Sequence, residues 1–69
     1  MNTVPLSPKW IEYLLQLPET GMGYQLVKIF LKNGKVLHKR KVINGSLLVL
    51  PPNEIISKDE IVKIEVEFN

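Results

Sequence analysis

The sequence of 69 residues contains no cysteine, and His38 is its only histidine. Without cysteine, disulfide bonds and thiolate metal sites are excluded, and one histidine is too few for an all-imidazole metal site. The lack of thiols fits a reducing compartment, and we expect a cytoplasmic protein. No cofactor is expected, because the glycines at Gly21 and Gly23 lack the third glycine and the following helix of a phosphate-binding loop.

Long apolar runs are also missing. The longest, Leu47 to Leu50, is far shorter than the roughly 18 residues of a membrane span. The opening MNTVPLSPKW has two prolines and lacks the apolar stretch of a signal peptide. We therefore expect neither a membrane segment nor a secretion signal.

The pentapeptide LPETG, residues 17–21, has the form that sortase enzymes cleave between Thr and Gly when they anchor proteins to a bacterial cell wall. Such a signal lies near the C-terminus and is followed by a membrane segment and a basic tail. Here the pentapeptide lies near the start of the sequence. We interpret it as an exposed, flexible connection rather than as a sorting signal.

The composition, with 45% hydrophobic and 23% charged residues, is that of one small globular domain. A chain of this length buries only about 60% of the surface that it exposes when unfolded, so it folds with little stability to spare. We divide it into a loose lead-in at residues 1–6, a helix at 8–16, a linker at 17–23 and a β-meander at 24–69.

The stretch SPKWIEYLLQLP carries helix signals at both ends. Ser7 is a suitable N-cap, Pro8 fits the first helical position, and Pro18 disfavours a longer helix. A helix this short is not stable alone in water, so its apolar stripe must dock on a sheet. The residues at helical spacing in that stripe are Trp10, Tyr13, Leu14 and Leu17.

Two Asn-Gly pairs between apolar runs predict successive β-hairpins. At the first, a two-residue loop would place Lys32 opposite Lys35 and so pair like charges. We therefore favour a three-residue loop that ends at Gly34 and pairs Ile29 with Leu37.

The second Asn-Gly pair, residues 44–45, is expected to form a two-residue loop that pairs Val42 with Leu47. Pro51 and Pro52 end this third strand, because proline cannot donate to a sheet ladder.

The capping-box spacing from Ser57 to Glu60 predicts one helical turn at the start of the last segment. Apolar and charged residues then alternate, which predicts a fourth, half-buried strand with four inward positions: Val62, Ile64, Val66 and Phe68. The predicted fold is mainly β (small α+β), with a short N-terminal helix and a four-stranded antiparallel meander. It would be a strongly bent sheet or an SH3-like barrel whose open end or face the helix covers.

Acidic residues are absent between Gly21 and Asn53, whereas six of the nine lysines and arginines lie there. In HKRK, residues 38–41, alternation sends cations to both faces of the strand, so neither face can be buried. The strand must therefore bulge there or project as an exposed ribbon. The candidate binding patch consists of Lys28, Lys32, Lys35, His38, Lys39, Arg40 and Lys41.

Three interpretations of this patch remain open. Glu65 and Glu67 could pair with hairpin lysines inside the protein. The cations could instead bind nucleic-acid phosphates, with Tyr24 and Phe30 as nearby aromatics, or attract an acidic protein partner. Lysines on an edge strand also hinder edge-to-edge aggregation.

Enzymatic activity is not expected, and we assign no catalytic or metal-binding residue. General acid–base catalysis needs a titratable pair in a cleft, and most acidic residues here lie at helix ends or on a solvent-facing strand. An enzyme would require a cleft that places His38 beside Glu12, Glu54 or Asp59.

The run LPETGMGYQLVKIFLKNG, residues 17–34, resembles the opening of short bacterial domains of unknown function, in which an LP…TG.GY segment leads into a strand ending in LKDG. Asn33 stands where that pattern tends to have Asp, a change that either turn type accepts. The resemblance implies a free-standing cytoplasmic bacterial protein without an assigned activity. The meander also resembles Sm-type and other SH3-like barrels in outline, without a nucleotide-pocket motif.

Apolar residues occur on both faces of the first and third strands, residues 26–30 and 47–50, which is more than one side of a small open sheet can bury. We therefore expect a non-enzymatic binding module for protein interaction or a structural role, with self-association through a strand edge as one form of it. The alternative is nucleic-acid binding through the basic hairpin. No small-molecule substrate is evident.

Overall fold

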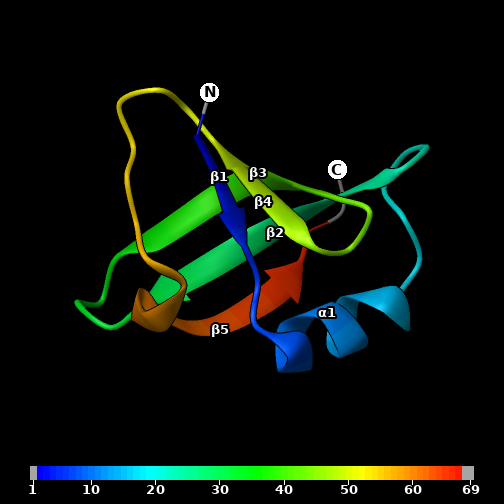
Figure 1. Ribbon diagram of the computed structural model, residues 1–69, viewed down its shortest axis with the longest axis horizontal. Helices are drawn as coiled ribbons and strands as arrows, with labels where there is room; N and C mark the ends of the chain where they lie inside the picture. Colours follow the sequence, from blue (N-terminus) through cyan, green and yellow to red (C-terminus); the bar gives the residue numbers. More distant parts are fainter. Residues whose placement is uncertain (1, 68–69) are drawn as a thin grey trace.

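The computed structural model describes residues 2–67, which form one open antiparallel sheet and one short α-helix (Figure 1). The predicted mainly β, small α+β fold is confirmed. Along the chain the elements are β1 (Asn2–Pro5), α1 (Pro8–Leu15), β2 (Tyr24–Leu31), β3 (Val36–Ile43), β4 (Leu47–Leu50), the 3₁₀ turn η1 (Lys58–Glu60) and β5 (Ile61–Val66).

The strand order is β1-β4-β3-β2-β5, so the sheet has five strands rather than the four expected. Residues 2–5, predicted to lie in a loose lead-in, form β1 and pair with β4 from Asn2 opposite Leu50 to Pro5 opposite Leu47. Because β1 occupies the outer side of β4, the last strand cannot continue the meander there. Instead β5 pairs with the other side of β2.

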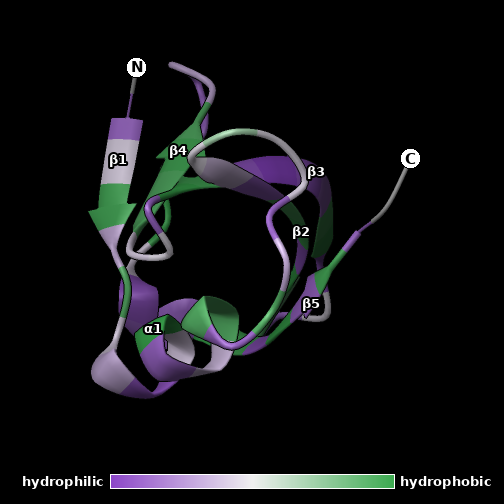
Figure 2. Ribbon diagram, turned by 90° about the vertical axis from the view of Figure 1, so that its right-hand side faces the viewer, coloured by the Kyte–Doolittle hydropathy of each residue, from purple (hydrophilic) through white to green (hydrophobic). Residues whose placement is uncertain are grey.

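Within the described residues β1 and β5 are the two edges of the sheet and do not pair with each other. Of the two predicted architectures, the structure therefore shows the bent open sheet. Figure 2 shows the sheet curving, with β1 and β5 on opposite sides and α1 lying between them at one end.

The inner, concave face of the sheet holds the core. Along β2 the side chains alternate without exception between buried and half-buried, because successive residues of a strand point to opposite faces. The buried apolar side chains are Leu6, Leu14, Val27, Ile29, Leu31, Leu37, Val42, Leu48, Leu50, Ile61 and Ile64.

The helix α1 docks by a face that differs slightly from the predicted stripe. Leu14 is fully buried, and Trp10 and Ile11 pack against the core. Tyr13, expected in the stripe, is 40% exposed and packs edge-on against the ring of Trp10 at 5.9 Å. Ser7 occupies the N-cap position without a side-chain capping bond.

Gln25 is a buried polar residue near the start of β2. Its side chain is 3% exposed, and its amide nitrogen lies 2.9 Å from the carbonyl oxygen of Leu14 and 3.3 Å from those of Leu17 and Pro18. These carbonyls lie at and just beyond the C-terminal end of α1, and of the three the Leu14 carbonyl also accepts the N–H of Leu17 at 3.1 Å. The Gln25 amide therefore ties the helix to the middle of the sheet.

The first hairpin has the predicted register. Ile29 lies opposite Leu37, and Gly34 at the end of the three-residue loop has φ +88°. Asn33 stabilises this loop by accepting a hydrogen bond from the N–H of Lys35 at 2.9 Å.

The predicted register of the second hairpin is wrong by one residue, since Val42 pairs with Leu48 and not with Leu47. The Asn-Gly turn does form, closed by a 3.0 Å bond from the N–H of Ser46 to the carbonyl of Ile43. Ser46 then adds an extra residue, and its carbonyl accepts the N–H of Leu6 at 3.0 Å. A one-residue slip exchanges the two faces of a strand, so this insertion turns Leu48 inward.

The LPETG connection is more ordered than predicted. Thr20 accepts the N–H of Leu26 with its hydroxyl at 2.8 Å and donates its own N–H to the carbonyl of Tyr24 at 3.0 Å. Gly21 lies against the Tyr24 ring, so closely that a Cβ atom there would be 2.4 Å from a ring carbon. The segment is therefore attached to the start of β2.

The segment before β5 forms the predicted helical turn with its capping box, in which the N–H of Ser57 donates to the Glu60 carboxylate at 2.8 Å. In β5 the pairing with β2 shifts at Val62, which is 55% exposed instead of facing inward. Ile61 takes the buried position in its place. The inward position predicted for Phe68 lies outside the described residues.

In the described part of the chain, no helix has the length and apolar character needed to cross a membrane.

Candidate binding surface

The HKRK stretch contains a β-bulge, one of the two predicted outcomes. Val27 pairs with Arg40 and Ile29 with Leu37, which leaves two residues of β3, His38 and Lys39, opposite one residue of β2. Lys39 has φ +52°, in the left-handed region that a non-glycine residue rarely adopts. The bulge changes the direction in which the cationic side chains leave the strand.

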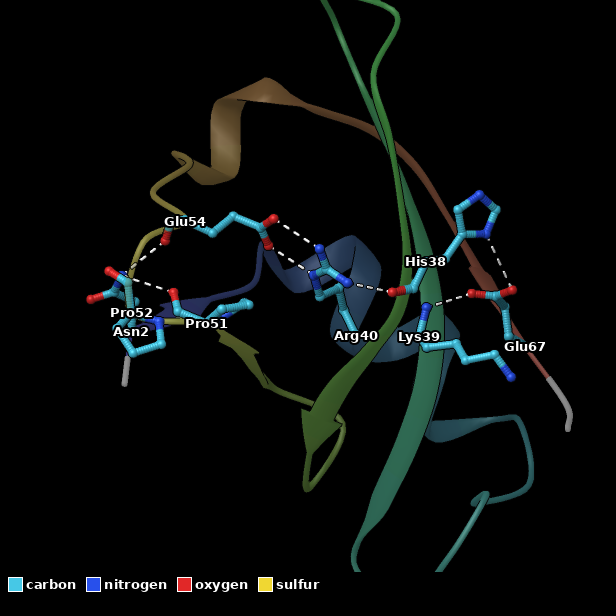
Figure 3. A network of polar contacts seen from close by, with 8 residues as sticks. All are labelled: Asn2, His38, Lys39, Arg40, Pro51, Pro52, Glu54 and Glu67. Carbon is cyan, nitrogen blue, oxygen red and sulfur yellow. Dashed lines mark hydrogen bonds and ion pairs between the residues drawn. The ribbon is translucent and has the colours of Figure 1, made fainter.

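Arg40 forms a two-pronged ion pair with Glu54, which lies in the loop after β4 (Figure 3). Its Nε and Nη2 each lie 2.8 Å from a different carboxylate oxygen of Glu54. These hydrogen bonds lower the pKa of Glu54 and raise the pKa of Arg40, while burial opposes both shifts. The charged Arg40 is therefore paired with a carboxylate of the same chain.

Glu67 holds the bulge from the opposite side (Figure 3). One carboxylate oxygen accepts the N–H of Lys39 at 2.7 Å, and the other lies 3.5 Å from Nδ1 of His38. The Lys39 N–H is the main cause that lowers the pKa of Glu67. The pairing of Glu67 with the hairpin, predicted as one interpretation, thus involves a backbone N–H and His38.

The position of His38 does not match the arrangement that a catalytic role would require. Its side chain is 61% exposed, and its carboxylate neighbour is Glu67 rather than Glu12, Glu54 or Asp59.

The structure does not bring the seven predicted patch residues into one cluster. Lys41 lies opposite Leu26, near the start of β2, whereas Lys32 and Lys35 lie at the hairpin loop beyond its end. Lys28 lies opposite Glu65, whose carboxylate forms an ion pair with Lys63 at 2.9 Å. The cations are therefore distributed along the hairpin, and carboxylates contact its bulged part.

The outer, convex face of the sheet carries apolar side chains as well as lysines. Cross-strand partners share a face, and the pairs Tyr24 with Ile43, Phe30 with Val36 and Ile43 with Leu47 all point outward. No helix of the described residues lies on this side (Figure 2). The half-buried or exposed apolar side chains of this convex face are Tyr24, Leu26, Phe30, Val36, Ile43, Leu47 and Val49.

Lysine ammonium groups lie over the two aromatic rings of this face. Nζ of Lys41 is 4.8 Å from the centre of the Tyr24 ring. Lys28 and Lys63 each lie 5.7 Å from the centre of the Phe30 ring. Lys63 was not part of the predicted patch, because its approach to Phe30 depends on β5 pairing with β2. Each such contact is worth roughly 0.5–1 kcal/mol at an exposed site.

A shallow, wide-open groove of about 470 Å³ lies where the bulge of β3 faces the end of β4. It is lined by Lys39, Arg40, Lys41, Val49, Leu50, Pro51 and Pro52. Since Lys41 and Val49 pair across the strands on the convex face, the groove is continuous with that face.

Comparison of the chain with protein-family models, curated proteins and solved structures finds no match in any of the three. The resemblance of residues 17–34 to the opening of short bacterial domains therefore stays a prediction.

Proposed function

We propose that this protein is a non-enzymatic binding module that docks a protein partner on the convex face of its sheet. The observation that carries this proposal is the set of seven half-buried or exposed apolar side chains on that face, over which no helix of residues 2–67 packs. An antiparallel sheet normally exposes polar residues on its open face, and contiguous exposed apolar surface marks interaction sites. A cytoplasmic location, favoured by the absence of cysteine, is part of the proposal.

The convex face suits this role better than the strand edges, where self-association was expected. At the β1 edge Pro5 has no N–H to donate, and the β5 edge is interrupted at Val62 and carries Lys63 and Glu65. Proline, bulges and charges are the features by which proteins prevent edge-to-edge pairing.

The test uses the protein as bait for partners and compares variants of matched chemistry. Leu47→Lys and Val36→Lys place a charge at the two most exposed aliphatic positions of the convex face. Ile55→Lys is the control, because Ile55 is 85% exposed but lies in the loop before η1.

We expect both convex-face variants to lose a partner that wild type and Ile55→Lys retain, measured by quantitative mass spectrometry of captured proteins. Equal retention by all four proteins, or equal loss with Ile55→Lys, contradicts the proposal.

Nucleic-acid binding is the second candidate, and the lysines over Tyr24 and Phe30 favour it. Bases stack on aromatic rings and phosphates attract ammonium groups, so such a surface suits a single strand. Binding of a fluorescent thymidine oligonucleotide should be detectable by anisotropy in low salt. It should weaken in a variant with Lys28, Lys41 and Lys63 changed to glutamine, but not with Lys58→Gln. The absence of binding in low salt excludes this candidate.

A further inference from the structure

A partly enclosed hollow of about 320 Å³ lies where the C-terminal end of α1 meets the turn between β3 and β4. Its lining comes from four segments: the end of α1, the LPETG connection, the start of β2 and the Asn-Gly turn at residues 44–45. Figure 1 shows the helix end, the connection and the turn on the same side of the molecule. The hollow shares no residue with the seven apolar residues of the convex face.

The hollow contains a buried amide with an unused acceptor. The nitrogen of the Gln25 side chain, a residue 3% exposed, lies within hydrogen-bond distance of three backbone carbonyls, whereas its oxygen accepts no hydrogen bond from residues 2–67. In this part of the chain, every fully buried side-chain nitrogen or oxygen has a hydrogen-bond partner. The Gln25 oxygen is therefore within reach of solvent. An N–H donor bound in the hollow would satisfy it, as is usual for a polar atom at a buried position.

The charge of the lining is negative. Glu19, an exposed residue of the LPETG connection, is its acidic member, and among residues 2–67 no lysine, arginine or histidine lines the hollow. The Glu19 carboxylate forms no ion pair with any of these residues. Complementary charges favour association, so a cationic ligand suits the hollow better than an anionic one.

Leucine side chains supply the apolar part of the lining. Leu15 is 66% exposed, yet it packs closely on the turn, because a Cβ atom added to Gly45 would lie 2.9 Å from a methyl carbon of Leu15. Leu17 is half-buried. An apolar group in the hollow would remove part of both leucines from water, which is favourable.

We propose that this hollow binds a small amine, in which an ammonium group is attached to a short apolar body. The ammonium donates to the side-chain oxygen of Gln25, and Glu19 is its counter-ion. The apolar body lies against Leu15 and Leu17. The volume is at the lower end of the range for ligand pockets, about 300–1,000 Å³, so the ligand is small. The inference goes beyond the proposed function, since it concerns another surface and another class of ligand.

The probe is phenethylamine, titrated at neutral pH into isotopically labelled protein and followed by chemical shifts. We expect saturable binding with a dissociation constant on the order of 1 mM, as suits so small a ligand. Phenethyl alcohol, which lacks the charge, should bind several-fold more weakly, and hydrocinnamate, with the opposite charge, should not bind. Equal binding of the three compounds, or no binding of phenethylamine, overturns the proposal.

The position of the shifts locates the site. The largest should be at Leu15, Gly45 and the side-chain amide of Gln25. The side-chain amide of Asn2, which also lies within hydrogen-bond distance of backbone carbonyls but belongs to β1, is the internal control and should not shift. Shifts centred away from the hollow, or equal shifts of the two side-chain amides, contradict the assignment.

Two matched pairs of variants test the lining. Glu19→Gln should weaken binding of phenethylamine about threefold, whereas Glu12→Gln, at an exposed position of α1 outside the hollow, should not. Leu15→Lys places an ammonium at the site and should abolish binding. Met22→Lys, at a residue of the same connection that is 99% exposed, should leave binding unchanged. Equal effects within either pair overturn the proposal.

A lysine side chain of another protein presents the same ammonium on an apolar stem, and acetyl-lysine amide represents this source. If it binds more tightly than phenethylamine, the hollow receives a protein side chain and the proposal of a free amine is wrong. Failure of both probes also contradicts the amine site. That result leaves the convex face untouched, because Leu47→Lys and Val36→Lys test it separately.

Discussion

The two faces of the sheet are both apolar, but only the concave face is covered. Leu47 and Leu48 are chain neighbours of the same residue type, and their exposed fractions are 38% and 0%. On the concave side α1 closes the core and Gln25 satisfies the end of the helix. The convex face has no such cover among residues 2–67, so its apolar residues contribute much less to folding. This difference separates residues kept for stability from those available for binding.

The largest expected effect comes from truncating the two leucines in turn. Leu48→Ala should lower the free energy of unfolding by about 3 kcal/mol, because it leaves a cavity in the core. Leu47→Ala should lower it by less than about 1 kcal/mol, since its side chain is already partly in water. Urea denaturation of both variants measures the comparison.

The same pair also tests the register of the second hairpin. In the two-residue loop predicted from the sequence, Leu47 and not Leu48 would share the buried face with Val42. Equal losses, or a larger loss for Leu47→Ala, would contradict the observed pairing and the distinction between the faces.

A smaller effect is expected where the concave face meets the helix. Gln25→Leu keeps a similar volume but removes the amide that donates to the carbonyls of Leu14, Leu17 and Pro18, which should cost about 2 kcal/mol. Gln16→Leu, at the exposed C-cap position, is the matched control and should change stability by less than about 0.5 kcal/mol. Chemical denaturation followed by circular dichroism distinguishes the two, and an unaffected Gln25→Leu would exclude this anchoring role.

The ion pair of Arg40 with Glu54 should contribute about 1 kcal/mol to the free energy of unfolding. Its two-pronged geometry is favourable, but both side chains are partly exposed. The pKa of Glu54 is lowered in the folded state. Its contribution is therefore fully present above the ordinary carboxyl pKa of about 4.3 and is lost as the pH falls through the lowered value.

Glu54→Gln should accordingly be less stable than wild type at neutral pH and lose less stability on acidification. Glu12→Gln, on the exposed surface of α1, is the control. Denaturant midpoints measured from neutral pH to below pH 4 test this, and parallel curves for wild type and Glu54→Gln would mean that the ion pair does not stabilise the fold.

The smallest effect concerns the LPETG connection. Thr20→Val removes the acceptor of the Leu26 N–H at a half-buried site and should cost about 0.5 kcal/mol. Because Thr20 and Gly21 are hydrogen-bonded to Tyr24, wild type should resist sortase cleavage in vitro and Thr20→Val should be cut faster. Rapid cleavage of folded wild type would show that the segment is as loose as the sequence alone predicts.

Local features of the fold could be predicted from the sequence. The register of the first hairpin follows from the repulsion between Lys32 and Lys35, and the capping box from the spacing of Ser57 and Glu60. The bulge at residues 38–41 follows from cations that alternate onto both faces. In each case the interacting residues are close together in the chain.

Features that depend on distant partners could not be predicted. The β1 strand is four residues long and contains Pro5, so only its pairing with β4 reveals it as a strand. The extra residue at Ser46 depends on the Leu6 N–H, and the approach of Lys63 to Phe30 depends on the placement of β5.

The same limit applies to the candidate binding surface. Its basic residues could be identified from the sequence, but the carboxylates that contact them could not. The neutralisation of Arg40 by Glu54 and the hold of Glu67 on the bulge join segments that are far apart in the sequence. The kind of partner that this surface can bind therefore depends on these contacts as well as on its lysines.

The strand order also has a consequence for how the chain folds. The strands β2, β3 and β4 join through short loops, whereas β1 and β5 reach the sheet by closing long loops, as in the pairs of Asn2 with Leu50 and Val27 with Val66. Long loops cost more entropy to close, so the central hairpins should form first and the two edges last. During synthesis, a chain that has reached Leu50 contains the residues of β1 to β4 and lacks those of β5.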